Sequence, residues 1–235
     1  MQASSIQSKH DEQPVHIPAA AITLEGNLIL PQGAAGMVLF AHGSGSSRHS
    51  PRNRHVARVL NDAKLATLLV DLLTTEEETI DMRTAHLRFD IGLLARRLVA
   101  VTDWLTEQPE THELRIGYFG ASTGAAAALV AASERAEAVS AIVSRGGRPD
   151  LAGAALTRVR APTLLIVGGN DFQVIELNRS ALAQLNCEKQ LVIVPGATHL
   201  FEEPGALDVV ARLACDWFER YLSRQPSEAK SHDKE

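Results

Sequence analysis

Short apolar runs alternate with longer stretches of helical period along most of the chain. Continuous apolar runs of this kind are typical of strands that are buried on both faces of a sheet. They occur at residues 37–41, 66–71, 114–119, 138–143, 163–167 and 191–194. Residues 15–17 and 21–30 come before them and predict an opening pair of strands.

The segments between these runs carry apolar residues at the spacings that one face of a helix requires. From Ile80 such a stripe continues to Leu105, which predicts one long helix over this segment. A second stripe from Leu207 to Tyr221 predicts a helix near the end of the chain. Trp217 lies in this second stripe, where we expect it to serve packing rather than chemistry.

Because strand and helix alternate repeatedly, the sequence predicts an α/β fold. We expect a mostly parallel sheet of about eight strands, with the first pair partly antiparallel and helices on both faces. Residues 14–222 should form a single domain, since no linker or change of composition divides them. Residues 1–13 and 223–235 are polar and unpatterned, so we expect flexible tails there.

The composition excludes several classes of protein. The 235 residues carry a net charge of −5, whereas proteins that bind nucleic-acid backbones are strongly basic. No apolar run reaches the roughly 18 residues of a membrane span, and the first residues lack the apolar segment of a secretory signal. We therefore expect a cytoplasmic protein without nucleic-acid or membrane partners.

Metal and cofactor sites are not predicted either. Cys187 and Cys215 are too few for a disulfide framework, and the histidines show no HExxH spacing. Gly43 and Gly45 follow a predicted strand and faintly suggest a dinucleotide site, but Arg48 stands where the third glycine belongs. Nucleotide binding is thus a weak alternative, and we expect neither a cofactor nor a metal.

In a parallel sheet, ligands bind beyond the carboxyl ends of the strands. The segment Gly120-Ala-Ser122-Thr-Gly124 follows one predicted strand and comes before a helical stretch. This is a G-x-S-x-G motif in the context of a nucleophile elbow, a sharp turn that exposes the serine hydroxyl. Ser122 is therefore the predicted nucleophile. The alternative is a turn that only packs a helix against the sheet.

A serine hydroxyl needs a base that a third group holds in place. Asp171 follows the run at 163–167, and His199 follows the run at 191–194. The chain order Ser122, Asp171, His199 is that of the α/β-hydrolases. We expect His199 to act as the base and Asp171 to orient its imidazole. Taken singly, His199 could be an ordinary loop residue and Asp171 a helix cap.

An oxyanion hole requires two donors that already point at the developing charge. We expect the backbone N–H groups of Thr123 and Ser44, the latter in the segment His42-Gly-Ser-Gly45. His42 is expected to hold this loop, with substrate contact as the alternative. Arg145 and Arg148 follow another strand and are candidates for binding an anionic substrate, although such arginines more often pair with loop acids.

From about residue 37 to residue 222, the chain resembles the α/β-hydrolase superfamily and, within it, the dienelactone hydrolase-like family. The resemblance rests on the motifs quoted above, which include Gly169-Asn-Asp171 and Gly196-Ala-Thr-His199. It implies a cytoplasmic hydrolase without a cofactor. Dienelactone hydrolases themselves carry a cysteine at the elbow, so Ser122 favours a general serine esterase. Only residues 144–160 lie where many superfamily members insert a cap domain, so we expect no large cap and an open site.

The leading hypothesis is a serine hydrolase that cleaves small carboxylic esters or lactones through an acyl-enzyme on Ser122. One alternative is a non-catalytic binding protein on a hydrolase fold. Another is an acyltransferase or perhydrolase that uses the same triad. The sequence names neither the acyl group nor the alcohol, and it leaves the formation of a homodimer open.

Overall fold

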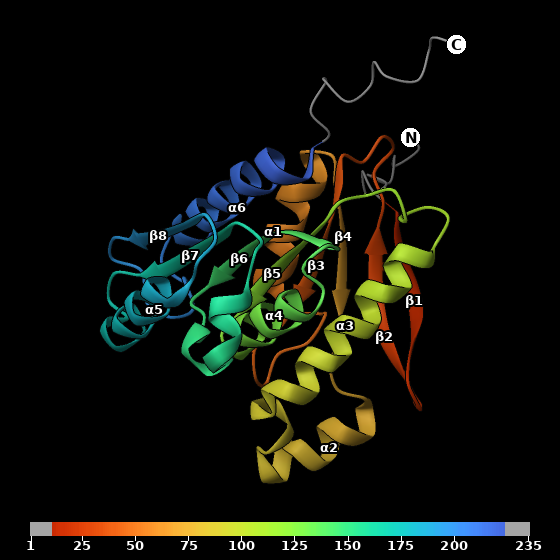
Figure 1. Ribbon diagram of the computed structural model, residues 1–235, viewed down its shortest axis with the longest axis horizontal. Helices are drawn as coiled ribbons and strands as arrows, with labels where there is room; N and C mark the ends of the chain where they lie inside the picture. The colour runs from red at the N-terminus through yellow and green to blue at the C-terminus, as the bar shows by residue number, and fades with distance from the viewer. Residues whose placement is uncertain (1–10, 224–235) are drawn as a thin grey trace, which may run out of the picture.

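The computed structural model describes residues 11–223 and contains one eight-stranded sheet between two layers of helices (Figure 1). The order of the strands across the sheet is β1-β2-β4-β3-β5-β6-β7-β8. β1 pairs with β2, and β2 with β4, in antiparallel fashion, and the other pairs are parallel. The predicted fold is therefore confirmed. The strands are β1 (Glu12–Ala19), β2 (Ile22–Ile29), β3 (Gly36–Ala41), β4 (Leu65–Val70), β5 (Ile116–Ala121), β6 (Val139–Arg145), β7 (Thr163–Gly168) and β8 (Lys189–Val194).

Helices cover both faces of this sheet. α1 and α6 pack on one face, whereas α3 and α4 pack on the other (Figure 1). Among the described residues, no helix is long and apolar enough to cross a membrane. The helical elements are α1 (Pro51–Asp62), α2 (Thr75–Thr84), the 3-10 helix η1 (Leu87–Phe89), α3 (Ile91–Glu107), α4 (Thr123–Glu134), the 3-10 segment η2 (Pro149–Arg158), α5 (Phe172–Gln184) and α6 (Ala206–Leu222).

The expected tails lie mostly outside the described residues. The first strand begins at Glu12, so Glu12 and Gln13 belong to the sheet rather than to a tail. At the other end, α6 finishes at Leu222, and the segment 224–235 lies beyond the described residues.

The central strands explain the continuous apolar runs in the sequence. Every residue of β3, β4, β5 and β7 is buried, because helices cover both faces of these strands. The parallel register places Ala41 beside Gly120, and Ala121 beside Arg145. The segments that follow β3, β5 and β6 therefore meet at one edge of the sheet, where the predicted site residues lie.

The single helix expected from Ile80 to Leu105 is wrong, because the segment divides into α2, η1 and α3. Ala85 ends α2 in the left-handed conformation, with a φ of 52°. The carboxylate of Asp90 then accepts a hydrogen bond of 2.8 Å from the Leu93 N–H and begins α3. Ile80 is 55% exposed, so it does not share the buried stripe of α3. Two strong local signals thus outweigh the continuity of the apolar spacing.

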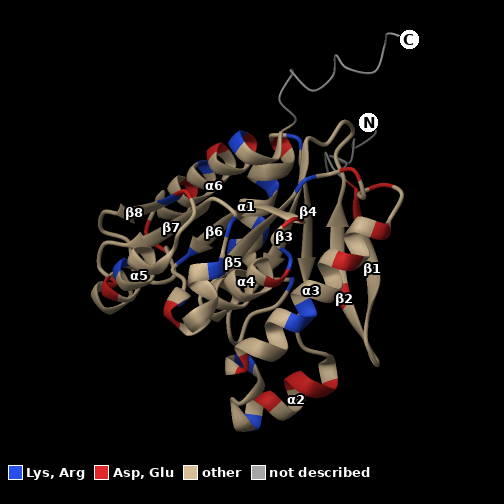
Figure 2. Ribbon diagram, viewed as in Figure 1, with Lys and Arg blue, Asp and Glu red and all other residues tan. Residues whose placement is uncertain are grey.

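α2 begins with a capping box that fixes its start. The Thr74 hydroxyl accepts a bond from the Glu77 N–H at 3.2 Å, and the Glu77 carboxylate accepts one from the Thr74 N–H at 2.8 Å. Its first turn carries three glutamates in a row, which suits the positive end of a helix (Figure 2). α2 lies away from α1 and α6, below the sheet in the view of Figure 1.

Substitution of Asp90 tests whether its side chain begins α3 and so separates α3 from α2. We expect Asp90→Ala to lower the free energy of unfolding by about 1 kcal/mol, because the Leu93 N–H loses its acceptor. Asp216→Ala, at an exposed position inside α6, is the matched control and should change it by less than about 0.5 kcal/mol. Urea denaturation measures both. Equal effects would show that Asp90 does not cap α3.

Candidate active site

Ser122 occupies the sharp turn between β5 and α4. Its backbone has φ 51° and ψ −122°, a strained combination for a residue with a side chain. The glycines on either side make the turn possible. A Cβ on Gly120 would lie 2.5 Å from the Cα of Ala125, and one on Gly124 would lie 2.2 Å from the carbonyl oxygen of Ala41. The structure thus contains the strand-turn-helix geometry that the motif predicts.

Backbone hydrogen bonds from the end of β6 hold this turn in place. The Ser122 N–H donates to the Arg145 carbonyl at 3.3 Å, and the Arg148 N–H donates to the Ser122 carbonyl at 3.0 Å. Ser122 is also the residue immediately before α4, so it lies at the positive end of that helix. This position favours negative charge that develops at or near its hydroxyl.

His199 and Asp171 follow β8 and β7, and their side chains meet. His199 Nδ1 lies 2.6 Å from Asp171 Oδ2. The Asp171 side chain is only 15% exposed, whereas that of His199 is 39% exposed. The two loops touch at Gly168, where a Cβ would lie 2.5 Å from the carbonyl oxygens of Ala197 and Thr198. The close contact of the loops therefore fixes the distance between the two side chains.

His199 also lies against the end of β6, next to the turn that holds Ser122. A Cβ on Gly146 would be 3.0 Å from the His199 carbonyl oxygen and 3.6 Å from its Cε1. Gly146 directly follows Arg145, whose carbonyl accepts the Ser122 N–H. The structure therefore brings Ser122, Asp171 and His199 to the same edge of the sheet.

The two expected oxyanion donors also lie together, with one difference from the prediction. Gly43 approaches the elbow so closely that a Cβ on it would lie 2.9 Å from the Ser122 Cβ. The next residue, Ser44, donates its N–H to the Thr123 Oγ1 at 3.0 Å. One of the two predicted donors thus already has an acceptor. Sequence reasoning treated Thr123 only as a backbone donor and missed this use of its side chain.

His42 holds the loop that carries Ser44. The Leu72 N–H donates to His42 Nε2 at 3.1 Å, and Nδ1 lies 3.0 Å from the Gly43 carbonyl oxygen. Because Nε2 accepts, Nδ1 carries the proton and the ring is neutral. Burial lowers the pKa of His42, and this effect outweighs the opposing influence of the Gly43 carbonyl and of the Asp71 charge. These contacts fit the role expected of His42, which is to hold the loop in place.

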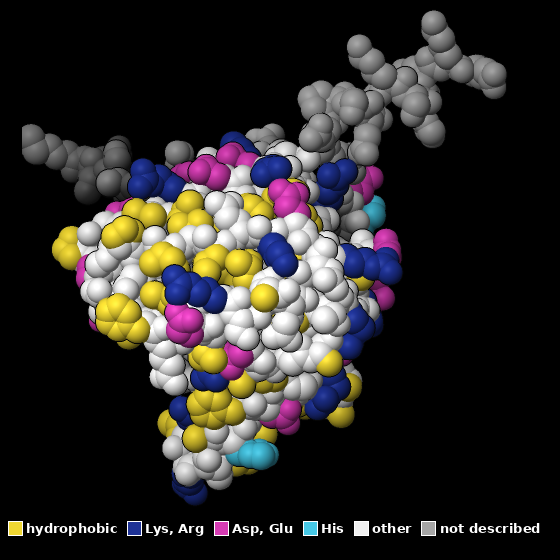
Figure 3. Space-filling model, turned by 60° about the vertical axis from the view of Figure 1, so that its left-hand side comes forward, with side chains coloured by type: hydrophobic (Ala, Val, Ile, Leu, Met, Phe, Trp, Pro, Cys, Tyr) yellow, Lys and Arg dark blue, Asp and Glu magenta, His cyan; other side chains and the backbone are white. Residues whose placement is uncertain are grey.

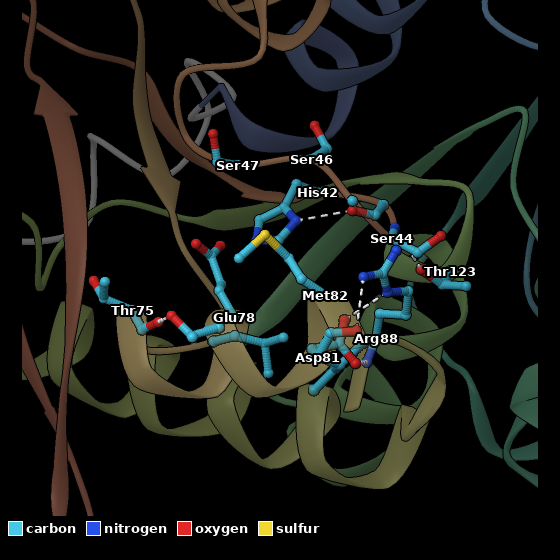
Figure 4. Close-up of a pocket in the computed structure, with 15 residues that line it drawn as sticks. His42, Ser44, Ser46, Ser47, Thr75, Glu78, Asp81, Met82, Arg88 and Thr123 are labelled. Atoms are coloured by element: carbon cyan, nitrogen blue, oxygen red, sulfur yellow. Dashed lines mark hydrogen bonds and ion pairs between the residues drawn. The ribbon is translucent and has the colours of Figure 1, made fainter. Parts of the chain in front are cut away.

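A cavity of about 410 Å³ opens beside this loop (Figure 4). One wall is the loop itself, and the opposite wall is α2, from which Met82 and Glu78 face His42 in Figure 4. Arg88 completes the wall, held by its Nε–H bond of 2.5 Å to the Asp81 carboxylate. Sequence reasoning missed Met82 and Arg88 because it assigned them to one long helix from Ile80 to Leu105, and it did not consider Glu78, which comes just before that helix. The capping box at the start of α2 was the available signal.

The structure does not place Arg145 or Arg148 on the wall of this cavity. Arg148 binds Asp150 through two hydrogen bonds of 2.9 and 2.8 Å. Arg145 is buried and points toward Asn53 of α1. The sheet alternation explains this, because Val143 and Arg145 share the face that α1 and α6 cover. Ser122, Asp171 and His199 do not line this cavity either, so the expectation that one of the two arginines contacts an anionic substrate stays a prediction.

Large apolar side chains are exposed next to several of these residues. Phe172 directly follows Asp171 and is 73% exposed, Leu200 directly follows His199 and is 39% exposed, and Met82 is 74% exposed. Figure 3 shows that hydrophobic side chains gather in clusters between charged ones on the face that it presents.

Within residues 11–223, no three His, Cys, Asp or Glu side chains are grouped so that they could hold a metal ion.

Comparison with known proteins finds similar sequences and structures over most of the chain. The sequence pattern of the Dienelactone hydrolase family matches residues 58–224. The crystal structure of a dienelactone hydrolase from Anabaena variabilis ATCC 29413 is similar, with 65% sequence identity and a TM-score of 0.90 over 91% of this chain and 99% of that one. A dienelactone hydrolase-like promiscuous phosphotriesterase from metagenomic libraries has 20% identity and a TM-score of 0.74 over 91% and 99% of the chains, which shows the fold alone.

A longer relative is known from Mycobacterium tuberculosis (strain ATCC 25618 / H37Rv). It is provisionally named a phosphoribosyl transferase and is 59% identical over 211 residues, which are 90% of this chain and 47% of that protein. The chain therefore spans about half the length of this curated relative.

The buried, neutral His42 predicts a specific dependence of stability on pH. Below about pH 6.5, its ordinary pKa, the unfolded chain takes up a proton that folded His42 resists, so the free energy of unfolding falls as the pH falls. His42→Gln should reduce this dependence. At pH 8 it should cost about 1–2 kcal/mol, since the hydrogen bonds to Gly43 and Leu72 are weakened.

Urea denaturation between pH 5 and pH 8 measures this effect. His49→Gln is the matched control, because His49 is exposed in the same loop. If His42→Gln and the unsubstituted protein lost stability equally on acidification, His42 would not be the group responsible.

Proposed function

Because the chain belongs to the dienelactone hydrolase family, we propose that it is a serine hydrolase that cleaves small carboxylic esters or lactones. One observation carries this proposal. The strained turn that presents Ser122 lies at the same sheet edge as a hydrogen-bonded pair of His199 and Asp171. Strained backbone conformations of this kind cluster at active sites, where the strain is part of the function.

In the proposed reaction, His199 takes the proton of the Ser122 hydroxyl while the serine oxygen attacks the carbonyl carbon. Asp171 keeps the proton of the ring on Nδ1 and stabilises the imidazolium that forms. His199 then gives its proton to the leaving alcohol, which leaves an acyl group on Ser122. A water molecule, deprotonated by His199, finally attacks this ester and releases the acid.

The oxyanion of each tetrahedral intermediate would receive hydrogen bonds from the backbone of Thr123 and Ser44. The Thr123 N–H belongs to the first turn of α4, where N–H groups have no partner within the helix. The Ser44 N–H must break its hydrogen bond to the Thr123 hydroxyl, or divide it between two acceptors, before it can donate to the substrate. The Thr123 hydroxyl therefore competes with the oxyanion for the Ser44 N–H, which is one of the two proposed donors.

The cavity supports a small substrate with an apolar part. Its volume of about 410 Å³ is at the lower end of ligand pockets, and Leu73, Met82 and Leu94 contribute apolar wall. Phe172 and Leu200, which directly follow Asp171 and His199 in the chain, add exposed apolar side chains outside this cavity. The absence of a cap between β6 and β7 leaves room for a larger alcohol group, with only η2 between these strands.

The activity in the name of the mycobacterial relative is not carried over to this chain. The match covers 47% of that protein, so the name can describe the part that lies outside the match. Within this chain, the arrangement of Ser122, Asp171 and His199 supports hydrolysis. Transfer of the acyl group to an alcohol or to peroxide uses the same residues, and product analysis with these acceptors distinguishes it from hydrolysis.

A fluorophosphonate probe tests the proposed nucleophile without knowledge of the substrate. We expect one covalent adduct on the unsubstituted protein, detected by intact-mass analysis, because an activated serine attacks the phosphorus. Ser122→Ala should abolish it, whereas Ser46→Ala, in the loop of the cavity wall, should retain it. A folded protein that forms no adduct would instead support a non-catalytic binding protein.

The competition at Thr123 leads to a second prediction. Thr123→Val keeps the shape of the buried side chain but removes the acceptor of the Ser44 N–H. We expect the rate of acylation to rise by about 2- to 10-fold, the equivalent of one ordinary hydrogen bond that no longer has to break. Thr123→Ser, which keeps the acceptor, is the control. A slower Thr123→Val enzyme would show that the hydroxyl itself helps to bind the oxyanion.

A further inference from the structure

Arg145, the last residue of β6, is a buried guanidinium that is 7% exposed. Among residues 11–223 no carboxylate binds it, and neither its Nε nor its Nη1 has a hydrogen-bond partner. Its Nη2 makes one long contact, 3.5 Å from Asn53 Oδ1. Arg97, which is equally buried, differs from it, because two hydrogen bonds of 3.1 and 2.6 Å join Arg97 to the Glu77 carboxylate.

The surroundings of Arg145 add positive charge rather than remove it. Burial, together with the positive charge of Arg52, lowers the pKa of Arg145 to about 10. Arg52 binds Glu202 through Nη1 at 3.1 Å, but its buried Nε has no partner. Arg52 lies in the first turn of α1, which contains no acidic residue. Asn53, which Arg145 contacts, belongs to the same turn, so the positive end of the helix dipole adds to the charge of the two guanidiniums.

A charge buried without a counter-charge is strongly unfavourable. A water molecule could satisfy the free N–H groups of Arg145 and Arg52. It could not balance the charge of Arg145, whereas Glu202 balances that of Arg52. The groups left unpaired, Arg145 Nε and Nη1 and Arg52 Nε, are donors, and helix N-termini favour anions. A ligand here must also give up most of its water, which favours a weakly hydrated monovalent ion over phosphate or sulfate.

We propose that a small inorganic anion of the chloride type binds between Arg145, Arg52 and the first turn of α1. This site is separate from the cavity, whose wall includes neither arginine. It lies where α1 meets the segment that follows β8. The bound anion would therefore brace the segment that carries His199, since Glu202 of that segment already binds Arg52.

Thermal unfolding at constant ionic strength tests this site, with chloride replaced by gluconate, which is too large to enter. We expect the melting temperature of the unsubstituted protein to rise by roughly 2–5 °C between gluconate and about 200 mM chloride, and to saturate. Arg145→Met should remove this rise. Arg148→Met should retain it, because Arg148 lies three residues along the chain but already binds Asp150.

Three results would overturn the proposal. The first is an unsubstituted protein with the same melting temperature in chloride and gluconate. The second is an Arg145→Met variant with an undiminished response. The third is stabilisation by phosphate alone, which would contradict the proposed class of ion.

Bromide provides a measurement that does not depend on a variant. Crystals of the unsubstituted protein in bromide should show anomalous scattering beside Arg145 Nε or Nη1, and a peak-free site would contradict the proposal.

Discussion

The arrangement of the whole site depends on how closely three backbones approach one another beneath Ser122. β3, β5 and the start of α4 meet with no room for a side chain, since a Cβ on Gly124 would lie 2.2 Å from the Ala41 carbonyl oxygen. This contact bends the chain so sharply that Ser122 takes a positive φ, at a cost on the order of 1–3 kcal/mol. The fully buried strands on both sides supply the rigidity that maintains it. The same approach brings Gly43 against Ser122 and Ser44 within reach of Thr123.

Much of this arrangement could be predicted from the sequence because it follows from the sheet. Buried parallel strands appear as continuous apolar runs, and their carboxyl ends share one edge, so the residues that follow each run are neighbours in space. This reasoning placed Ser122, Asp171 and His199 together without any knowledge of side-chain direction. It could not predict that Arg145 turns toward α1. That depends on which face of the sheet the last residue of β6 occupies, and a strand read as wholly apolar shows no alternation.

The same limit explains the other differences. The apolar stripe from Ile80 onward is a feature of a long segment, whereas the cap at Asp90 is a single carboxylate that accepts one N–H. A reading that relies on spacing therefore continues the helix past the point where it ends. The hydrogen bond from Ser44 to Thr123 lies even further from what a sequence can show. It depends on the rotamer of one side chain across a contact between residues that are 79 positions apart.

The segment from Thr74 to Asp90 differs from the rest of the molecule in how it is attached. The ion pair of Glu77 with the buried Arg97 joins it to α3, whereas the Arg88–Asp81 pair lies within it, and α2 contributes no apolar side chain to the buried core. Changes of sequence in α2 would therefore alter the wall of the cavity while the sheet and the elbow keep their packing. A protein built in this way can acquire a new substrate preference by exchanging one surface element. For an engineer, the exposed positions of α2, such as Ile80 and Met82, are the ones to change, whereas Glu77 and Asp90 should be kept because they bind the buried Arg97 and cap α3.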